Sequence, residues 1–274
     1  MKWNNFLHWL LCLILSMVTV TYAMAAEDAE YPYRARYLAV PYVETGDFHK
    51  RRDKTLVVDV RSSYEYDTLR IKGAINIPVS SATFFDAIRK LRDENPNKEI
   101  VFYCNGKTCH KSYEAVQKSR NNKIMNTVAY DAGVFDWVKS YPDESELLGR
   151  SPVDPKKLIS KDRFKAHSIT ADKFESMVAS DNNIVLDVRD RLQRDGVALF
   201  PGIDKVAVLD DKATLDKHID AARRGKKTLL FYDAAGKQVE WLMYYLEDKE
   251  VKDYYFMDGG AEAFFKKLNK QYVK

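Results

Sequence analysis

The stretch that decides the fold is Glu99-Ile-Val-Phe-Tyr-Cys104-Asn-Gly-Lys-Thr-Cys109-His-Lys-Ser112. Its apolar run ends abruptly at Cys104, and a helical pattern over 110–121 follows a short polar loop. A continuous apolar run of this kind is typical of a strand that is buried on both faces of a parallel sheet. Ligands bind beyond the carboxyl ends of the strands in such sheets, so Cys104 stands where chemistry is expected.

Strands and helices alternate on both sides of this loop. The predicted strands are 37–40, 55–60, 74–78, 99–103 and 126–130, and the predicted helices are 83–92, 110–121 and 134–139. The strands are short β-branched or apolar runs, and the helices carry apolar residues at helical spacing. This alternation favours an α/β fold built on a parallel sheet.

The same order of elements recurs further along the chain. A helix is predicted over 169–179 with Thr170 as its N-cap, and the matching strand endings carry closely similar residues. Three matches lie at nearly one offset, which is 128 residues between Asp59 and Asp187, 129 between Cys104 and Asp233, and 127 between Gly133 and Gly260. Repeats of this length are duplicated domains rather than the units of a solenoid.

Four motifs of the first copy together resemble the rhodanese (sulfurtransferase) family. They are Asp59-Val-Arg61 at the end of a strand, Gly73-Ala-Ile-Asn-Ile-Pro78, Tyr103-Cys104, and the turn from Asp131 to Trp137. The resemblance covers roughly residues 35–142 and 166–272. It implies a tandem form with the cysteine in the N-terminal domain, and two α/β domains, each with a mostly parallel five-stranded sheet and helices on both faces.

The predicted domains follow from this resemblance and from composition. Residues 1–25 are a signal peptide, 35–142 the domain with the Cys104 loop, and 166–272 a degenerate domain with Asp233 in place of cysteine. The proline-rich, glycine-rich and charged range 143–165 is predicted to be a linker. The cysteine loop departs from the family pattern because it is about two residues longer, which leaves open which cation faces the substrate and whether thiosulfate is the donor.

The resemblance implies that Cys104 is catalytic and carries a sulfane sulfur as a persulfide in a ping-pong reaction. A thiolate is the nucleophilic form of cysteine, and the start of the following helix would stabilise it through N–H groups and the helix dipole. The predicted substrate-binding residues are Asn105, Gly106, Lys107, Thr108, His110 and Lys111. Lys107 is the favoured cation because Lys237 occupies the matching stretch of the second copy, whereas His110 and Lys111 could equally form a solvated first helical turn.

Cys109 has three possible roles. It could resolve a Cys104 persulfide or take part in redox chemistry, form a structural disulfide with Cys104, or be a free loop residue. Asp59 and Arg61 are expected to brace the loop through an ion pair, because Asp187 and Arg189 repeat them in the copy that lacks the cysteine. One pair of cysteines without a second ligand pair does not predict a metal site, and no cofactor is expected.

Three functions compete on these observations. The first is a rhodanese-like sulfurtransferase that takes sulfur from a small donor anion or a persulfide and gives it to a thiol or protein acceptor. The second is a thiol redox protein that cycles a Cys104–Cys109 disulfide, and the third is a non-catalytic module that binds a partner. A phosphatase or arsenate reductase loop is disfavoured because His110, not arginine, is the sixth residue after Cys104.

Composition and the N-terminal segment bear on location and partners. The 274-residue chain has 44 Lys and Arg against 40 Asp and Glu, and these charges are interspersed, so no nucleic-acid partner is expected. Lys2, an apolar run over 9–20 and the Ala23-Met24-Ala25 site together predict a cleaved secretory signal peptide. The protein is therefore expected to be exported, and periplasmic if its source is a Gram-negative bacterium. A membrane is a partner only if the segment stays uncleaved as an anchor.

Overall fold

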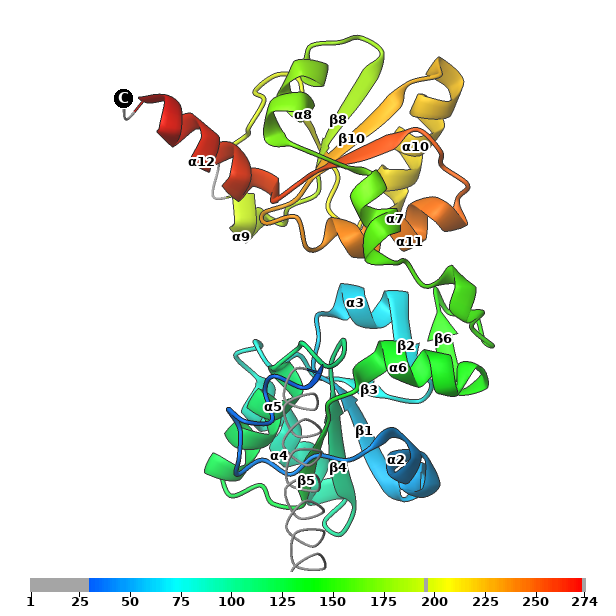
Figure 1. The fold of residues 1–274 in the computed structure, drawn as a ribbon, viewed down its shortest axis with the longest axis vertical. Coiled ribbons are helices and arrows are strands. Elements are labelled where there is room, and N and C mark those ends of the chain that lie inside the picture. Colours follow the sequence, from blue (N-terminus) through cyan, green and yellow to red (C-terminus); the bar gives the residue numbers. More distant parts are fainter. Residues whose placement is uncertain (1–29, 195–196, 273–274) are drawn as a thin grey trace, which may run out of the picture. The chain divides into compact units, whose positions relative to one another are not determined.

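The computed structural model describes residues 30–194 and 197–272, so the predicted signal peptide lies outside the described residues. The chain divides into two compact units between Pro155 and Lys156, which we call unit 1 and unit 2 (Figure 1). Among the described residues, no helix is long and apolar enough to cross a bilayer.

Unit 1 is built on a parallel sheet of four strands. Their order is β3 (Ile75–Asn76), β1 (Thr55–Asp59), β4 (Glu99–Tyr103) and β5 (Thr127–Tyr130). Strand β4 lies in the interior of this sheet, and its last four residues are buried, as the apolar run predicts. A fifth chain segment reaches the β5 edge only as an isolated parallel bridge between Tyr42 and Ala129. The predicted strand 37–40 is therefore wrong, because turns occupy that range and the pairing falls at 41–43.

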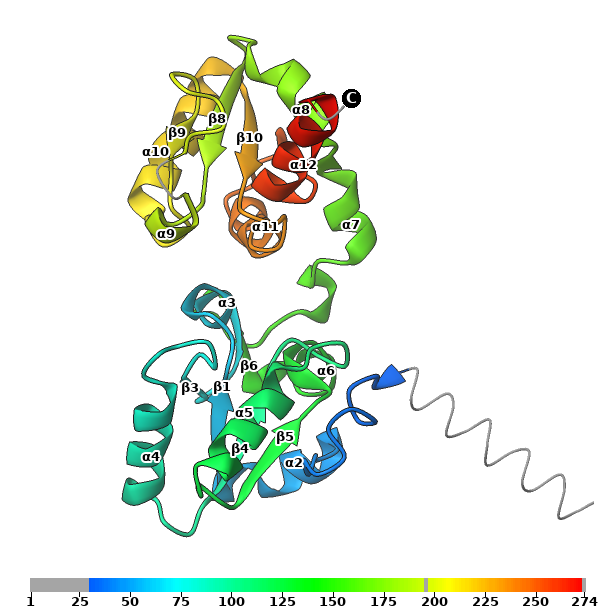
Figure 2. The same ribbon diagram turned by 90° about the vertical axis from the view of Figure 1, so that its left-hand side faces the viewer.

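Helices cover both faces of this sheet (Figure 2). One face carries α4 (Phe84–Glu94) and α5 (Lys111–Asn121), whose apolar side chains share a core with β1 and β4. The other carries α2 (Thr45–Arg51) and α6 (Gly133–Ser140), where Phe48 packs 4.8 Å from Trp137 between ring centroids. Short elements complete the unit: η1 (Arg52–Lys54), α3 (Ser63–Thr68), β2 (Leu69–Ile71), η2 (Pro142–Glu144) and β6 (Ser145–Leu147).

Part of the range predicted as a linker is regular structure. Strand β6 pairs with β2 in an antiparallel ribbon within unit 1. Within the same range, η3 (Pro155–Lys157) spans the division and α7 (Lys161–Ala166) opens unit 2, with Ser160 as its N-cap. The alternating apolar residues Leu69, Ile71 and Leu147 explain the ribbon, because all three are buried.

Unit 2 repeats the strand order of unit 1. Its parallel sheet runs β7 (Ser168–Ile169), β11 (Tyr254–Met257), β10 (Thr228–Tyr232), β8 (Asn183–Asp187) and β9 (Lys205–Val206). Helices α8 (Ala171–Val178) and α12 (Gly260–Tyr272) pack together on one face, and α10 (Lys212–Gly225) and α11 (Val239–Asp248) are linked by a Tyr245–Asp216 hydrogen bond. A one-turn helix, α9 (Arg191–Arg194), follows β8. Thr170 caps α8 as predicted, accepting from the Lys173 N–H at 3.3 Å.

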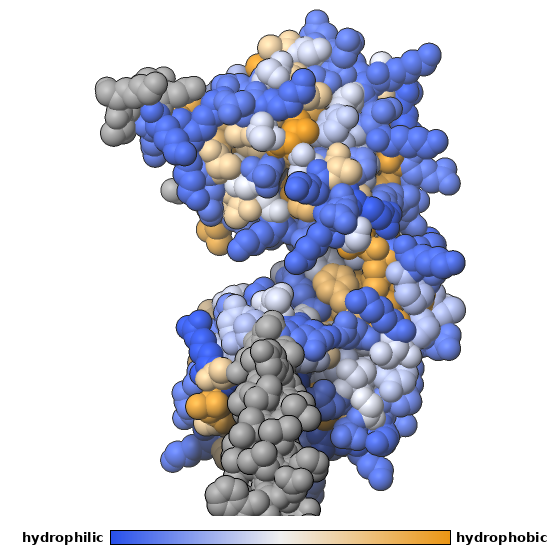
Figure 3. All heavy atoms as spheres, in the orientation of Figure 1, coloured by the Kyte–Doolittle hydropathy of each residue, from blue (hydrophilic) through white to orange (hydrophobic). Residues whose placement is uncertain are grey.

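The fold class is thus the predicted one, with a parallel sheet covered by helices in each unit. Five strands are present in unit 2, whereas unit 1 has four and a bridge. Figure 3 shows hydrophilic residues over most of the visible face of each unit, with hydrophobic residues in smaller groups, which agrees with the interspersed charges of the sequence.

Candidate active site

The cysteine loop joins β4 to α5 and is held from below by the first turn of α6. The Val134 N–H donates to the Cys104 carbonyl at 3.0 Å, and the Phe135 N–H donates to the Asn105 carbonyl at 3.3 Å. Gly133 makes this approach possible: its φ is +70°, and a Cβ there would collide with the backbone of Asn105 and Gly106. The turn that supplies the family motif is therefore what fixes the position of the loop.

The two cysteines of unit 1 are neighbours, and both are free thiols. Cys104 is fully buried, and its Sγ donates to the Cys109 carbonyl at 3.3 Å and to Ser112 Oγ at 3.8 Å. Burial raises the pKa of the Cys104 thiol well above its ordinary value. A hydrogen bond from the Cys104 side chain, together with the backbone N–H groups of Lys111 and Asn105, lowers the pKa of Cys109 to about 7.

These contacts correct the prediction about the thiolate. The sequence predicts that the loop and the helix start stabilise a thiolate at Cys104. Burial raises the pKa of Cys104 more than the N–H group of Ser112 lowers it, whereas the N–H groups of Lys111 and Asn105 act on Cys109. The physical reason is depth: Cys104 ends a core strand with no exposed surface, whereas Cys109 is half-buried. Cys109 is thus the more acidic of the two thiols, and its backbone carbonyl accepts from the Cys104 Sγ at 3.3 Å.

Alkylation should separate the two thiols by pH. We expect Cys109 to react with iodoacetamide at a rate that rises through pH of about 7, with Cys104 reacting far more slowly. Peptide mass spectrometry after timed alkylation between about pH 5 and pH 9 measures both rates. Cys104→Ala removes the thiol hydrogen bond and should move the midpoint for Cys109 upward, whereas Ser80→Ala, outside the loop, should leave it unchanged. Preferential alkylation of Cys104 at low pH would contradict this assignment.

The favoured cation, Lys107, is already paired with carboxylates. Its Nζ forms ion pairs with Glu30 and, at 3.0 Å, with Asp136, and it lies 5.3 Å from the centroid of the Tyr31 ring. The Glu30 hydrogen bond, followed by those of Asp136, raises the pKa of Lys107. Lys107 is therefore placed beside the loop, but its charge is engaged before any substrate arrives.

The other predicted binding residues differ in their surroundings. His110 lies 3.7 Å from Glu114, with its ring 5.4 Å from that of Tyr33, and it is exposed. Lys111 is 3.8 Å from Glu65. Thr108 is exposed in the middle of the loop, and Gly106 lies under α6, where an added Cβ would come within 3.2 Å of the Ala132 carbonyl. The structure brings all these residues to one loop, but the three cations each have an acidic neighbour.

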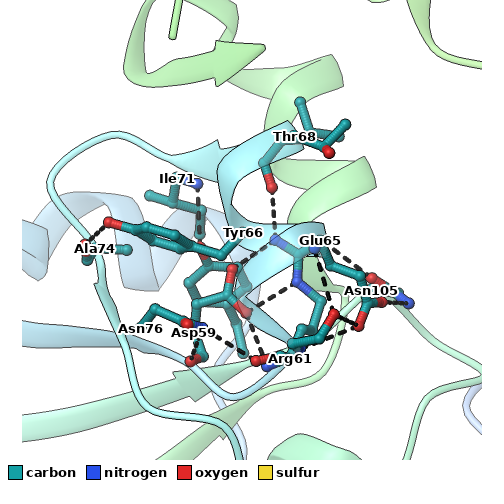
Figure 4. A network of polar contacts seen from close by, with 12 residues as sticks. Asp59, Arg61, Glu65, Tyr66, Thr68, Ile71, Ala74, Asn76 and Asn105 are labelled. Carbon is teal, nitrogen blue, oxygen red and sulfur yellow. Dashed lines mark hydrogen bonds and ion pairs between the residues drawn. The ribbon is translucent and has the colours of Figure 1, made fainter. Parts of the chain in front are cut away.

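A buried polar network supports the loop from the side of β1 (Figure 4). Arg61 Nε donates to Asp59 Oδ1 at 2.9 Å, and Arg61 Nη1 donates to Asn105 Oδ1 at 3.1 Å. Asn105 in turn donates to Glu65 Oε1 at 3.0 Å. Through Asn105, the Asp59–Arg61 pair contacts the cysteine loop, as the predicted bracing role requires. The bracing role itself stays a prediction.

Glu65 is a site residue that the motifs do not reveal. It is 9% exposed and bonds both Asn105 and the Ser62 N-cap of α3, in a reciprocal capping box. Although burial works against its charge, Arg61 and Lys111 keep the pKa of Glu65 below its ordinary value. The Ser-x-x-Glu spacing of a capping box is the sequence signal that could have found it.

The matching loop of unit 2 is filled by its own carboxylate. Asp233 Oδ2 accepts from the N–H groups of Gln238 at 2.6 Å and Val239 at 3.2 Å, and Oδ1 accepts from the Gly236 N–H. The Ala261 N–H holds the Asp233 carbonyl at 2.8 Å, just as Val134 holds that of Cys104. Helix α11 starts six residues after Asp233 and α5 seven after Cys104, so the first loop is one residue longer than the second.

Neither unit shows a metal centre in the described ranges. No group of three or more His, Cys, Asp or Glu side chains that could hold a metal ion occurs within residues 30–194 and 197–272.

Comparison with known families identifies the first unit. The rhodanese-like domain family matches residues 44–140. This part of the chain is a rhodanese-like domain. Unit 2 lies outside the match, but its strand order and its loop at Asp233 support the predicted tandem form.

Curated relatives share only part of their length with this chain. It is 26% identical over 98 residues to the tRNA uridine(34) hydroxylase of Acinetobacter baylyi, covering 35% of this chain and 30% of that protein. It is 34% identical over 68 residues to the tRNA uridine(34) hydroxylase of Bacillus mycoides, covering 24% and 21%. The chain thus spans less than a third of the length of these relatives.

Solved structures give similarities of low score. A thiosulfate sulfurtransferase from Pseudomonas aeruginosa is 18% identical with a TM-score of 0.36, covering 88% of this chain and 47% of that chain. An As-Sb reductase from Leishmania major is 20% identical with a TM-score of 0.34, covering 46% and 97%. TM-scores this low do not indicate a function for this chain.

Proposed function

We propose that this protein is an exported sulfurtransferase in which Cys104 carries sulfane sulfur from a donor to a thiol acceptor. The observation that supports this most strongly is the placement of Cys104 at the carboxyl end of β4 within a rhodanese-like domain, with its Sγ donating to the carbonyl of Cys109 at 3.3 Å. The donor is a small anion or a persulfide, and the acceptor is a small thiol or a protein.

The reaction uses the two cysteines in different roles. Cys109 accepts the proton of Cys104, and the Cys104 thiolate attacks the sulfane sulfur of a donor R–S–S⁻. The donor S–S bond breaks, R–S⁻ leaves, and the outer sulfur remains on Cys104 as a persulfide. A thiolate acceptor then attacks that outer sulfur, gains it as a new persulfide, and releases Cys104 as a thiolate. Alternatively, the Cys109 thiolate attacks the inner sulfur of that persulfide, the persulfide S–S bond breaks, and the outer sulfur leaves as hydrosulfide while a Cys104–Cys109 disulfide forms.

Intact mass spectrometry of the reduced protein tests the proposal. Incubation with cysteine persulfide should add one sulfur, about 32 Da, to the wild type as a persulfide. Peptide mapping should place the adduct on Cys104, and Cys104→Ser should abolish the adduct at that position. Cys109→Ser should still load Cys104, but more slowly, because it keeps the nucleophile and lacks the base. The proposal fails if no donor, thiosulfate included, ever loads Cys104 in the reduced protein.

One observation favours a second candidate, a thiol redox protein. The two free cysteines are neighbours, since Cys104 Sγ donates to the Cys109 carbonyl at 3.3 Å, so an oxidant could join them in a disulfide. Titration in glutathione redox buffers, with mass spectrometry to count free thiols, measures this equilibrium. A stable disulfide in the wild type with no sulfur loading at any potential would favour this candidate over sulfur transfer.

Export is part of the proposal and rests on the sequence of residues 1–25. If the segment is cleaved after Ala25, N-terminal sequencing of the protein from its native source should start at Ala26. A chain that keeps these residues and sediments with membranes would support the anchored alternative instead.

A further inference from the structure

A tyrosine-rich segment that precedes the rhodanese-like match contacts the cysteine loop. We call residues 30–37 the N-terminal strap. Glu30 and Tyr31 contact Lys107, and the ring of Tyr33 lies 5.4 Å from that of His110. Tyr37 stacks on Tyr113 of α5, with centroids 5.3 Å apart and an angle of 19° between the rings. The family match begins at residue 44, so the strap is an addition to the matched domain.

A mostly buried arginine fixes the strap in place. Arg34 Nε donates to Asp131 Oδ2 at 2.8 Å, and its Nη2 donates to Glu44 Oε1 at 2.9 Å. Its guanidinium carbon lies 3.8 Å from the ring centroids of both Tyr31 and Tyr42. Asp131 is the first residue of the turn that holds the cysteine loop, so the strap and the loop share one support.

The strap completes the neutralisation of the loop cations. Glu30 joins Asp136 on Lys107, while the carboxylates of Glu114 and Glu65 lie near His110 and Lys111. Each loop cation therefore has a carboxylate beside it, although Glu114 also pairs with Lys118 at 2.7 Å. A substrate with two negative charges gains little attraction from cations that are already paired with carboxylates.

We infer that the strap sets the donor selectivity of the loop, disfavouring an inorganic dianion such as thiosulfate and favouring the persulfide of a thiol. This inference rests on the proposed sulfur transfer. The two donors differ in charge and leaving group: a persulfide of the form R–S–S⁻ brings one negative charge and releases R–S⁻, whereas thiosulfate brings two and releases sulfite. In both cases the outer sulfur becomes the persulfide of Cys104.

Glu30→Gln tests the inference by removing one carboxylate from Lys107. Single-turnover loading of Cys104 should be measured by intact mass with thiosulfate and, separately, with cysteine persulfide. The ratio of the thiosulfate rate to the persulfide rate should rise by about fivefold to tenfold at low salt, because a surface charge pair contributes on that scale, and the gain should shrink as ionic strength increases. Glu30 is exposed, so the variant should fold as the wild type does.

Two further variants make the result specific. Adding Lys107→Gln to Glu30→Gln should remove the gain, since the freed cation is then absent. Glu175→Gln is the matched control, because Glu175 shares Lys267 with Asp172 in unit 2 as Glu30 shares Lys107 with Asp136. It should leave the ratio unchanged.

The outcomes separate the inference from the proposed function. A wild type that loads faster from thiosulfate than from the persulfide, or a ratio that Glu30→Gln does not change, would overturn the donor selectivity while leaving sulfur transfer intact. Failure of both donors to load Cys104 in the wild type and in Glu30→Gln would instead reject the proposed function, and the inference with it.

Discussion

Replacing Arg61 with alanine should lower the free energy of unfolding of unit 1 by about 3–5 kcal/mol, the cost typical of breaking a buried ion pair from one side. Arg61 and Asp59 are both fully buried, and the guanidinium donates to Asp59 through Nε and Nη2. The variant would leave the Asp59 carboxylate without its cation in the core. Urea denaturation followed by fluorescence measures the loss, with the two units fitted as separate transitions.

The same variant should also impair sulfur loading, because Arg61 reaches the loop through Asn105. Arg189→Ala is the matched control in unit 2. Its bidentate pair with Asp187 is also buried, so it should destabilise unit 2 and leave the loading rate of Cys104 unchanged. If Arg61→Ala prevents folding altogether, Asn105→Ala keeps the ion pair and cuts only the contact with the loop. Normal loading by Asn105→Ala would show that the network does not position Cys104.

The scaffold around Cys104 is predictable from the sequence because local and non-local signals agree there. An apolar run of strand length can be buried on both faces only in a sheet that helices cover, and β4 meets that expectation. Both copies also end a strand in Asp-Val-Arg, and this repetition predicts an ion pair between the aspartate and the arginine of each copy. The helix starts are accurate to one or two residues, as at α5 and α8.

The finer features of the site depend on contacts between distant residues, and no local pattern shows these. The apolar residues of 37–40 predict a strand, but the ring of Tyr37 stacks on that of Tyr113 and the segment forms turns. The strap contacts join residues far apart in sequence, such as Glu30 and Lys107. The contrast between Cys104 and Cys109 also arises from depth in the core, which the spacing of two cysteines does not encode.

Asp233→Cys, placed in a Cys104→Ser background, should create a new sulfur-loading site in unit 2. The carboxylate of Asp233 sits at the end of β10 and accepts from three loop N–H groups, those of Gly236, Gln238 and Val239. An aspartate oxygen and the outer sulfur of a cysteine persulfide are the same number of bonds from Cα. The N–H groups that hold Asp233 are therefore suited to hold the terminal sulfur anion of a persulfide at position 233.

Intact mass after incubation with cysteine persulfide measures this gain, which should be one sulfur of about 32 Da on a protein that otherwise takes up none. Asp233→Ser in the same background is the matched control, because serine is close to cysteine in size and cannot hold sulfane sulfur. The Asp233→Cys protein should be tested under conditions where the wild type loads Cys104. If it then carries no adduct, the N–H groups that hold the Asp233 carboxylate do not hold a cysteine persulfide. An adduct would instead mean that the two units differ in sulfur chemistry chiefly by the side chain at the end of one strand.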